Sequence, residues 1–268
     1  MVFLRVLFLF LILTFPATAE PGDFDGSDFQ RSYDRGDYVS ALGIIRPYAN
    51  RGDINAQIML GVMYYKGQGV DQSYSKAADW YRKAGNRGNA TAQMLLGKLY
   101  FEGQGVEKDR AESVRWYRKA AAQGNSDGQF NLGNMYNQGW GVMQDYDEAA
   151  RLYREACEQD HAGACSSVGT MYGEGRGINL DQVEAFKWYQ KAAGLGGTAA
   201  KVQLGLSYSQ GWGVPKDNVQ AYMWIDLAVA SGEISIRDYL DILANIMTPD
   251  EVAEAKRKAG EWRAAHRQ

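Results

Sequence analysis

The sequence predicts an all-α solenoid of helix–turn–helix repeats, each about 36 residues long, with capping helices at its ends. A glycine that follows leucine or valine recurs at this constant step, and so do a tyrosine, a turn glycine and a tryptophan. The positions are Gly61, Gly97, Gly133, Gly169 and Gly205; Tyr64, Tyr100, Tyr136, Tyr172 and Tyr208; Gly69, Gly105, Gly141, Gly177 and Gly213; and Trp80, Trp116, Trp188 and Trp224. Such a period is typical of a solenoid, in which each unit buries its apolar face only against its neighbours.

Each copy is expected to form two helices. In the copy that begins at Asn89, this residue can cap a helix over 90–102, and Gly103 ends it because glycine adopts the left-handed conformation readily. Asp109 caps the second helix, and Glu112 three residues later completes a capping box. The box recurs as Asp145 with Glu148, Asp181 with Glu184 and Asp217 with Gln220. Boxes in phase with the period predict where each second helix begins.

The glycine inside each first helix needs a packing explanation, because glycine within a helix costs about 0.5–1 kcal/mol relative to alanine. Gly97 and its counterparts recur in register, so we expect close contact between the helix backbones at these positions. We expect the aromatic pair Trp116 and Tyr117 to fill the space between neighbouring repeats.

The ends of the array differ from its repeats. Residues 20–28 are acidic and glycine-rich and are expected to be a loose leader, so residues 20–35 hold this leader and the start of an N-terminal cap. Segments 29–33 and 38–50 predict a degenerate opening helix pair, the second helix kinked or loosened by Pro47. The array spans 36–232, with five repeats that start near 53, 89, 125, 161 and 197.

Residues 233–268 predict two C-terminal capping helices, 234–246 and 249–265. Thr248 and Glu251 form a capping box with Pro249 at the first helical position. Because solenoids need atypical end units for solubility, we expect these helices to be caps.

The first 19 residues have the pattern of a cleaved secretory signal. Arg5 gives a positive start, segment 6–15 is apolar, and Ala17-Thr18-Ala19 is a cleavage site of small residues. A membrane anchor is the alternative, but the run is shorter than the roughly 20 apolar residues that a span needs. We therefore expect cleavage after Ala19, a periplasmic or secreted chain, and no transmembrane segment in the mature protein.

The charge of the chain argues against a nucleic-acid partner. The formal net charge is −3, and lysine and arginine are scattered along the sequence. A nucleic-acid-binding protein needs a clustered basic face. We expect another protein as the partner.

The repeated pattern Ala-Gln-x-x-Leu-Gly-x-x-Tyr-x-x-Gly-x-Gly-Val, followed by an Asp-capped segment and Trp-Tyr-x-Lys-Ala, resembles the Sel-1-like repeat, a relative of the tetratricopeptide repeat. The resemblance covers about residues 36–232. It implies a right-handed superhelix with a concave surface lined by the first helix of each pair. It also implies an adaptor or scaffold without a common catalytic site. Secreted bacterial members include regulators of sensor kinases, exopolysaccharide-export scaffolds and host-interaction factors.

The third repeat departs most from the others. Leu152 stands where other copies have tryptophan, and Glu155 stands where three others have lysine. Cys157 and Cys165, the only cysteines of the sequence, lie where this repeat meets the fourth. In a secreted protein such a pair across a short turn predicts a disulfide, with two buried free thiols as the alternative. The spacing is similar to that of cysteine-rich Sel-1-like proteins of bacteria, which staple each helix pair in this way.

Two tryptophans, Trp140 and Trp212, lie between the glycines of their turns, where other copies have Gln68, Gln104 and Arg176. Each is a candidate anchor for a partner, since tryptophan is enriched among the residues that dominate binding energy. Packing over a neighbouring helix pair is the alternative.

The candidate partner-binding surface follows from stepping by three and four residues along each first helix. The positions are Met59, Val62, Lys66, Leu95, Lys98, Glu102, Asn131, Asn134, Gln138, Ser167, Thr170, Gln203, Leu206 and Gln210. The centre, from Asn131 to Thr170, is polar and nearly uncharged. Asparagines in a concave groove can hold an extended peptide backbone by hydrogen bonds; a solvated face without a ligand is the alternative.

The search for an enzymatic site finds one weak match. Ser73 and Lys76 fit the Ser-x-x-Lys pattern of penicillin-recognising enzymes, but the Ser-Asp-Asn and Lys-Thr-Gly partners are missing. Ser73 also falls where other repeats place the capping aspartate, so a helix cap is the simpler interpretation. His161 occupies a capping position and His266 lies in the tail, and neither belongs to a four-ligand zinc set. No metal or cofactor is expected.

Two functions remain as hypotheses. The first is a periplasmic or secreted scaffold or regulator, for example of a sensor kinase or of envelope or exopolysaccharide machinery. The second is a hydrolase that binds β-lactams or peptidoglycan fragments, as cysteine-rich Sel-1-like proteins have been associated with β-lactams. Fold alone does not decide between them.

Overall fold

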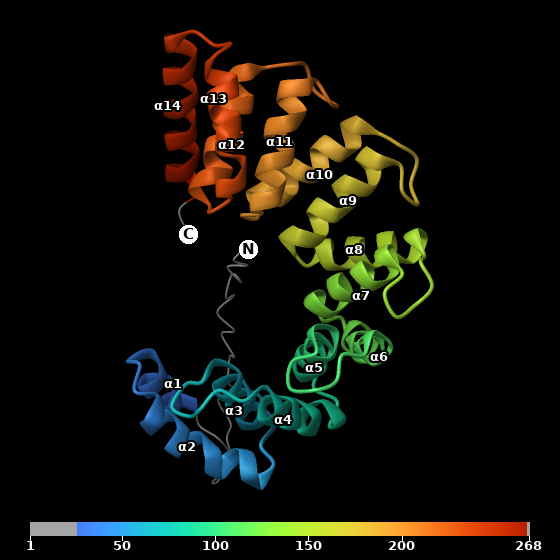
Figure 1. The fold of residues 1–268 in the computed structure, drawn as a ribbon, viewed down its shortest axis with the longest axis vertical. Coiled ribbons are helices and arrows are strands. Elements are labelled where there is room, and N and C mark those ends of the chain that lie inside the picture. Colours follow the sequence, from blue (N-terminus) through green and yellow to red (C-terminus); the bar gives the residue numbers. More distant parts are fainter. Residues whose placement is uncertain (1–25, 267–268) are drawn as a thin grey trace.

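The computed structural model describes residues 26–266, and over this range it consists of 14 α-helices, one 3₁₀-helix and their connecting turns, without strands. The helices follow one another along a curved array from α1 to α14 (Figure 1). The predicted all-α solenoid is therefore confirmed. The expected signal segment and its cleavage site lie outside the described residues and stay a prediction.

Five helix pairs form the body of the array. The first helices of the pairs are α3 (Ile54–Lys66), α5 (Ala90–Glu102), α7 (Ser126–Gln138), α9 (Ala162–Glu174) and α11 (Thr198–Gln210). The second helices are α4 (Tyr74–Asn86), α6 (Arg110–Ala121), α8 (Tyr146–Glu158), α10 (Gln182–Gly194) and α12 (Asn218–Ala230). Each helix packs mainly against its neighbours in sequence, as in other solenoids.

The second helices begin where predicted, but their N-terminal caps differ from the expected capping box. The Asp109 carboxylate accepts a hydrogen bond from the backbone N–H of Glu112 at 2.9 Å, and the aspartates of α8, α10 and α12 do the same. The backbone N–H of Asp109 donates to the carbonyl oxygen of Tyr100 at 3.0 Å. Because that N–H is already satisfied, the Glu112 side chain pairs with Arg115 at 2.9 Å.

The glycine inside each first helix makes room mainly for a side chain of the second helix. A Cβ at Gly97 would lie 2.8 Å from the Tyr117 ring. The expected backbone approach is also present, since the Ser113 carbonyl oxygen would lie 3.3 Å from the same Cβ. Counterparts of this contact are Gly61 with Tyr81, Gly133 with Tyr153, Gly169 with Tyr189 and Gly205 with Ile225. A larger residue would displace the side chain that fills each helix pair, which is a tyrosine in four units and Ile225 in the fifth.

The turn glycines join successive units. Gly105 has a φ of 69°, which is left-handed, and a Cβ there would lie 2.1 Å from the carbonyl carbon of Tyr74 at the start of α4. Glycine alone combines this conformation with so close an approach. The turn of each unit therefore packs closely against the start of the second helix in the preceding helix pair.

The periodic tryptophans close the junctions between units, as predicted. Trp116 on α6 is buried, and its ring carbon Cζ3 lies 3.4 Å from the position of a Cβ at Gly85 in α4. The Lys119 ammonium lies 4.0 Å from the centre of the Trp116 ring, and Lys83 lies 3.9 Å from that of Trp80. A lysine therefore covers the tryptophan where both are present.

The N-terminal pair is α1 (Gly26–Asp34) and α2 (Tyr38–Arg51). α1 begins at Gly26, within the expected loose leader, because Phe29 is buried and its ring lies 5.5 Å from that of Tyr33. α2 continues through Pro47 to Arg51, so the proline does not end it.

The C-terminal cap differs from its prediction at one helix. The expected helix over 234–246 was wrong as a single element: it is a 3₁₀ turn, η1 (Ile234–Ile236), followed by α13 (Asp238–Ala244). Ile234 and Ile246 are exposed, so the ends of this segment have no core to hold them in one helix. α14 (Pro249–Ala265) is as predicted, with the complete box between Thr248 and Glu251.

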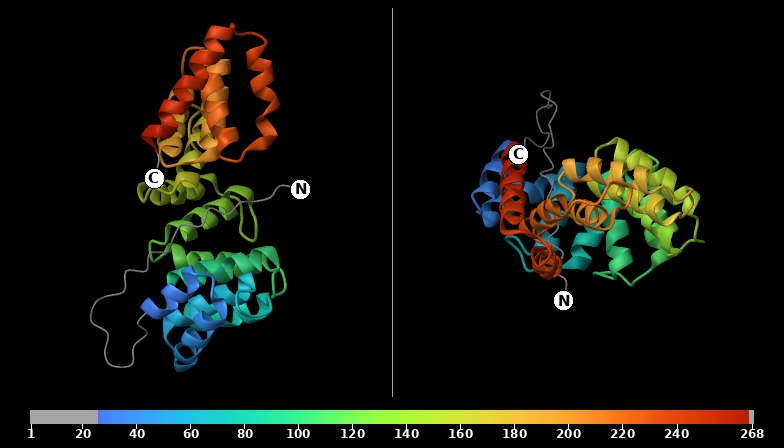
Figure 2. Two further views of the ribbon diagram at one scale, coloured as in Figure 1. Left: turned by 90° about the vertical axis from the view of Figure 1, so that its left-hand side faces the viewer. Right: turned by 90° about the horizontal axis from the view of Figure 1, so that it is seen from above.

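The first helices lie on the inner side of the curve. α5 touches α7 and α9 touches α11, whereas among the described helices no second helix contacts the next second helix to that extent. Helices on the inner side of a bent array lie closer together than those on its outer side. α1 and α14 lie at opposite ends of the long axis of the array (Figures 1 and 2).

Candidate functional site

The predicted partner-binding residues form a row on the first helices α3, α5, α7, α9 and α11. Glu102, Gln138 and Gln210, each in the last turn of its helix, are exposed. The others are half-buried: Met59, Val62, Lys66, Leu95, Lys98, Asn131, Asn134, Ser167, Thr170, Gln203 and Leu206. A row of partly accessible side chains on successive helices is a surface that another chain can contact.

Part of this row belongs to the core. Met59 packs against the buried residues of α2 and α3. Val62 and Leu95 pack against the cluster that contains Tyr81 and Trp116. These three side chains therefore contribute to the core as well as to the surface. The residues of the row that are outside these two clusters lie mainly further along the array.

Tyrosines of the second helices form hydrogen bonds with Asn134 and Thr170, at the centre of the row. The Tyr153 hydroxyl donates to Asn134 Oδ1 at 2.7 Å, and the Tyr189 hydroxyl donates to Thr170 Oγ1 at 3.3 Å. Thr170 Oγ1 in turn donates to the carbonyl oxygen of Ser166 at 3.1 Å. The polar centre of the row is thus held in one arrangement.

Both tyrosines remain protonated at neutral pH. Burial raises the pKa of Tyr153, although a hydrogen bond with Ser167 works in the opposite direction. Burial also raises the pKa of Tyr189, although its hydrogen bond with Thr170 lowers it. The centre of the row therefore carries no charge from these groups, in line with its predicted polar and uncharged character.

Sequence reasoning did not connect the tyrosines with this surface. The signal was present: Asn134 and Thr170 each stand 19 residues before a second-helix tyrosine. In the fifth unit the second-helix residue is Ile225 and the first-helix residue is Leu206. In the first unit, however, the apolar Val62 stands at this distance before Tyr81, so the spacing alone does not identify the hydrogen-bonded pairs.

The N-terminal end of the row is charged. Lys66 donates to the Tyr33 hydroxyl at 3.3 Å, and burial lowers the pKa of this lysine. Lys98 lies 5.9 Å from the centre of the Tyr65 ring and 3.9 Å from a carboxylate oxygen of Glu102. The row therefore changes from lysine-bearing at α3 and α5 to neutral at α7 and α9.

The two turn tryptophans differ in their surroundings. Trp140 packs on the preceding unit, with its ring 5.3 Å from that of Phe101 and 5.2 Å from the Arg110 guanidinium. Two repeats further along the chain, Gly173 and Gln182 occupy the positions of Phe101 and Arg110. Trp212 therefore has neither an aromatic ring nor a guanidinium group at the positions that pack on Trp140. Trp212 is 48% exposed. Packing accounts for Trp140, while Trp212 stays a candidate anchor.

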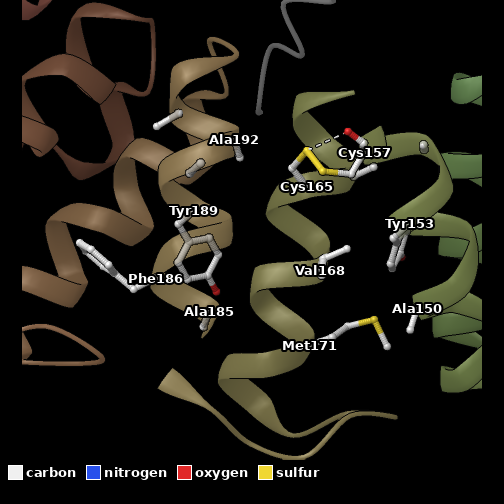
Figure 3. Close-up of a cluster of buried hydrophobic side chains, with 14 of the residues drawn as sticks. Ala150, Tyr153, Cys157, Cys165, Val168, Met171, Ala185, Phe186, Tyr189 and Ala192 are labelled. Carbon is white, nitrogen blue, oxygen red and sulfur yellow. Dashed lines mark hydrogen bonds between the residues drawn. A yellow bond between two sulfur atoms is a disulfide. The ribbon is translucent and has the colours of Figure 1, made fainter. Parts of the chain in front are cut away.

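The predicted disulfide is present. The Cys157 and Cys165 sulfurs are 1.96 Å apart and join the end of α8 to the start of α9. Both residues are fully buried in the core that α8 and α9 share with α10 (Figure 3). Lys191 of α10 donates to the carbonyl oxygen of Cys157 at 3.1 Å. The alternative of two free thiols is therefore wrong.

A family profile described as the Sel1 repeat matches five consecutive segments of the chain: 54–89, 90–125, 126–161, 162–197 and 198–233. The chain belongs to the Sel1-repeat family. The boundaries coincide with the five helix pairs. Proteins of this family generally mediate protein–protein interactions, and Sel1-repeat scaffolds are generally not enzymes.

Solved structures of other Sel1-repeat proteins are similar to this one. A protective antigen of uropathogenic Escherichia coli strains has 34% identity and a TM-score of 0.72, over 87% of this chain and 52% of that one. The present chain thus spans about half the length of that antigen. A Sel1-repeat protein from Oxalobacter formigenes has 29% identity and a TM-score of 0.75, over 86% of this chain and 94% of that one.

An immunity protein from Pseudomonas aeruginosa shares the fold alone, with 19% identity and a TM-score of 0.54, over 76% of this chain and 82% of that one. A comparison with curated proteins finds no match.

The residues weighed for catalysis are structural within the Sel1 units. Ser73 Oγ accepts the backbone N–H of Lys76 at 3.4 Å, as the cap of α4, and the Lys76 ammonium lies 5.3 Å from the centre of the Tyr64 ring. His161 Nδ1 accepts the backbone N–H of Ala164 at 3.0 Å, as the predicted cap of α9. Ser73 Oγ also lies 3.2 Å from Ser75 Oγ, and His161 Nε2 lies 3.2 Å from Asp127 Oδ1, so neither contact joins a nucleophile to a base.

Residues 26–266 show neither a group of three or more potential metal ligands nor a bilayer-spanning helix. The first statement concerns His, Cys, Asp and Glu side chains placed together. The second concerns the length and hydropathy of the helices in the described part of the chain.

Proposed function

We propose that this Sel1-repeat protein is a periplasmic or secreted scaffold or regulator that binds a partner protein on the inner side of its curve, at the surface formed by α7 and α9. Regulation of a sensor kinase, or service to envelope or exopolysaccharide machinery, is the kind of process that such a scaffold would support. The proposal rests on the family, on the disulfide and on one feature of the inner face.

That feature is the neutral polar centre formed by Asn131, Asn134, Ser167 and Thr170, all half-buried. An amide side chain both donates and accepts hydrogen bonds, as does each peptide unit of an extended chain. Because Asn134 and Thr170 are already oriented by Tyr153 and Tyr189, binding would cost little side-chain entropy. An extended segment of a partner protein fits these properties.

An extracytoplasmic location is supported by two observations. Disulfides form and persist in oxidising compartments, and Cys157 and Cys165 are joined. The first 19 residues have the pattern of a secretory signal. The similar protein from uropathogenic Escherichia coli strains is a protective antigen, which agrees with such a location.

The proposal is tested by affinity capture from a cell-envelope extract of the source organism, followed by mass spectrometry. Asn131→Arg with Gln138→Arg places two bulky charges on the inner face, and we expect the captured partner to be lost. Arg115→Ala with Lys187→Ala changes two exposed residues of the second helices and should leave capture intact. Equal capture by both double variants would overturn the proposed surface.

A further inference from the structure

The third unit lacks the pair of residues that closes the other junctions. Leu152 replaces the tryptophan found at the same position of the other four units, and Glu155 replaces the lysine that lies over it in three of them. Leu152 is 2% exposed and packs with Leu132 and Tyr117, so the shorter side chain is drawn into the core.

A hollow of about 540 Å³ opens between α6 and α8 at this place. Leu132 and Leu152 form its buried floor together with Gln129, and Arg118, Arg151 and Glu155 border it. Its volume lies within the roughly 300–1,000 Å³ that is usual for binding sites. The bordering residues Arg118, Arg151 and Glu155 lie on second helices, whereas the surface proposed above lies on first helices.

The hollow coincides with the position of the absent tryptophan ring. In the second unit, Trp116 and Gln93 both pack against Gly85. One repeat later the corresponding residues are Ala121 and Gln129, and both line the hollow. The neighbouring units thus show which side chain this space is shaped to hold.

The polar groups around the hollow also differ from those of the other units. Gln93 Nε2 donates to the Gly85 carbonyl oxygen at 2.9 Å, whereas Gln129 Nε2 donates to Glu155 Oε2 at 3.1 Å. Arg151 pairs with both Glu148 and Glu155. The hollow therefore has a carboxylate acceptor and flanking guanidinium groups, and guanidinium groups stack well on aromatic rings.

We propose that this hollow binds a tryptophan side chain presented by a partner protein. The partner supplies the ring that the other units take from their own chain, and the Arg118 and Arg151 guanidinium groups cover it as Lys119 covers Trp116. Tryptophan is also one of the residues enriched among those that dominate binding energy at protein interfaces. The site is separate from the inner face, so either surface can fail its test without the other.

The first test uses N-acetyl-tryptophanamide as the probe, titrated into the full-length chain and followed by ¹H–¹⁵N NMR spectra. We expect saturable shifts of the backbone signals of Ala121, Ala122 and Gly124 and of the Gln129 side-chain amide. Shifts confined to other residues, or an absence of shifts at millimolar probe, would overturn the proposal. This map needs no variant and does not depend on one folding.

The second test fills the hollow from within. Leu152→Trp should weaken probe binding by about tenfold or more. Met143→Trp adds the same ring at an exposed position of the same unit and should leave binding unchanged. Equal binding by Leu152→Trp and the wild type would overturn the site. Self-association of the wild type that Leu152→Trp abolishes would replace the partner by a second copy of this chain, and so would also overturn the proposal.

Discussion

The disulfide between Cys157 and Cys165 joins the same two chain positions that a glutamine hydrogen bond joins in earlier units. Gln57 Nε2 donates to the Ala49 carbonyl oxygen at 3.2 Å, and Gln93 Nε2 donates to that of Gly85 at 2.9 Å. In each case the residues are eight apart and tie the end of one helix to the start of the next. The disulfide therefore strengthens a connection that the repeat already contains.

Removal of the disulfide should destabilise the array without changing its fold. We expect Cys157→Ala with Cys165→Ala to lower the free energy of unfolding by about 2–3 kcal/mol, because the open chain regains loop entropy. Cys157→Ala with Cys165→Gln restores the glutamine donor and should recover about 1 kcal/mol of this loss. Urea unfolding of the three proteins measures both effects. A double-alanine variant as stable as the wild type would contradict the assigned role.

The glycine inside α5 should be intolerant of a methyl group. In Gly97→Ala the new Cβ would lie 2.8 Å from the Tyr117 ring, so the ring or the helix must shift. We expect a loss of about 1–3 kcal/mol in the free energy of unfolding. Gly260→Ala is the matched control, because nothing lies within 4 Å of its Cβ position in α14. This control should gain about 0.5–1 kcal/mol from helix propensity, and equal effects of the two changes would contradict the packing argument.

The buried tyrosines should make the array sensitive to alkali. Burial raises the pKa of Tyr81, Tyr117, Tyr153 and Tyr189. Because the folded chain holds these protons more tightly than the unfolded chain, their contribution is complete below the unfolded pKa of about 10 and declines as pH rises above it. Unfolding free energies measured between about pH 8 and pH 11 should therefore fall.

Tyr153→Phe tests this explanation directly. The variant removes one titrating group, so its unfolding free energy should fall less steeply with pH than that of the wild type. It should also be less stable at neutral pH by about 0.5–1.5 kcal/mol, because the hydrogen bond to Asn134 is lost. Identical pH dependence in both proteins would show that Tyr153 does not contribute.

Restoring the repeat pattern in the third unit should stabilise it. Leu152→Trp with Glu155→Lys fills the hollow and returns the lysine that covers the ring in other units. We expect a gain of about 0.5–2 kcal/mol, as for other cavity-filling changes toward a consensus. Thermal unfolding compared with Met143→Trp separates this gain from the mere presence of another tryptophan. A less stable double variant would show that the hollow does not have the shape of a tryptophan ring.

The features predicted correctly from the sequence were those with local or periodic causes. Helix starts at Asp109 and its counterparts, and helix ends at glycines such as Gly103, follow from contacts within a few residues. The disulfide followed from two cysteines placed across one short turn. The period then fixed which helices are neighbours.

The features that the sequence did not reveal depend on contacts between separate elements. The carbonyl of Tyr100 satisfies the Asp109 N–H, so Glu112 is not needed for a box. The segment after Gly232 is divided because its terminal isoleucines find no core. Leu152 was recognisable as a departure, but only the structure shows that a hollow stays open beside it.

The most direct test of the proposed function is site-specific photocrosslinking in living cells. A photoreactive residue at Asn131 or Gln138 should give crosslinks to one and the same partner protein, because both lie on the inner face of α7. The same residue at Arg115 or Lys187, on second helices, should not reach that partner. Crosslinks to it from Arg115 and Lys187 but not from Asn131 and Gln138 would contradict the account.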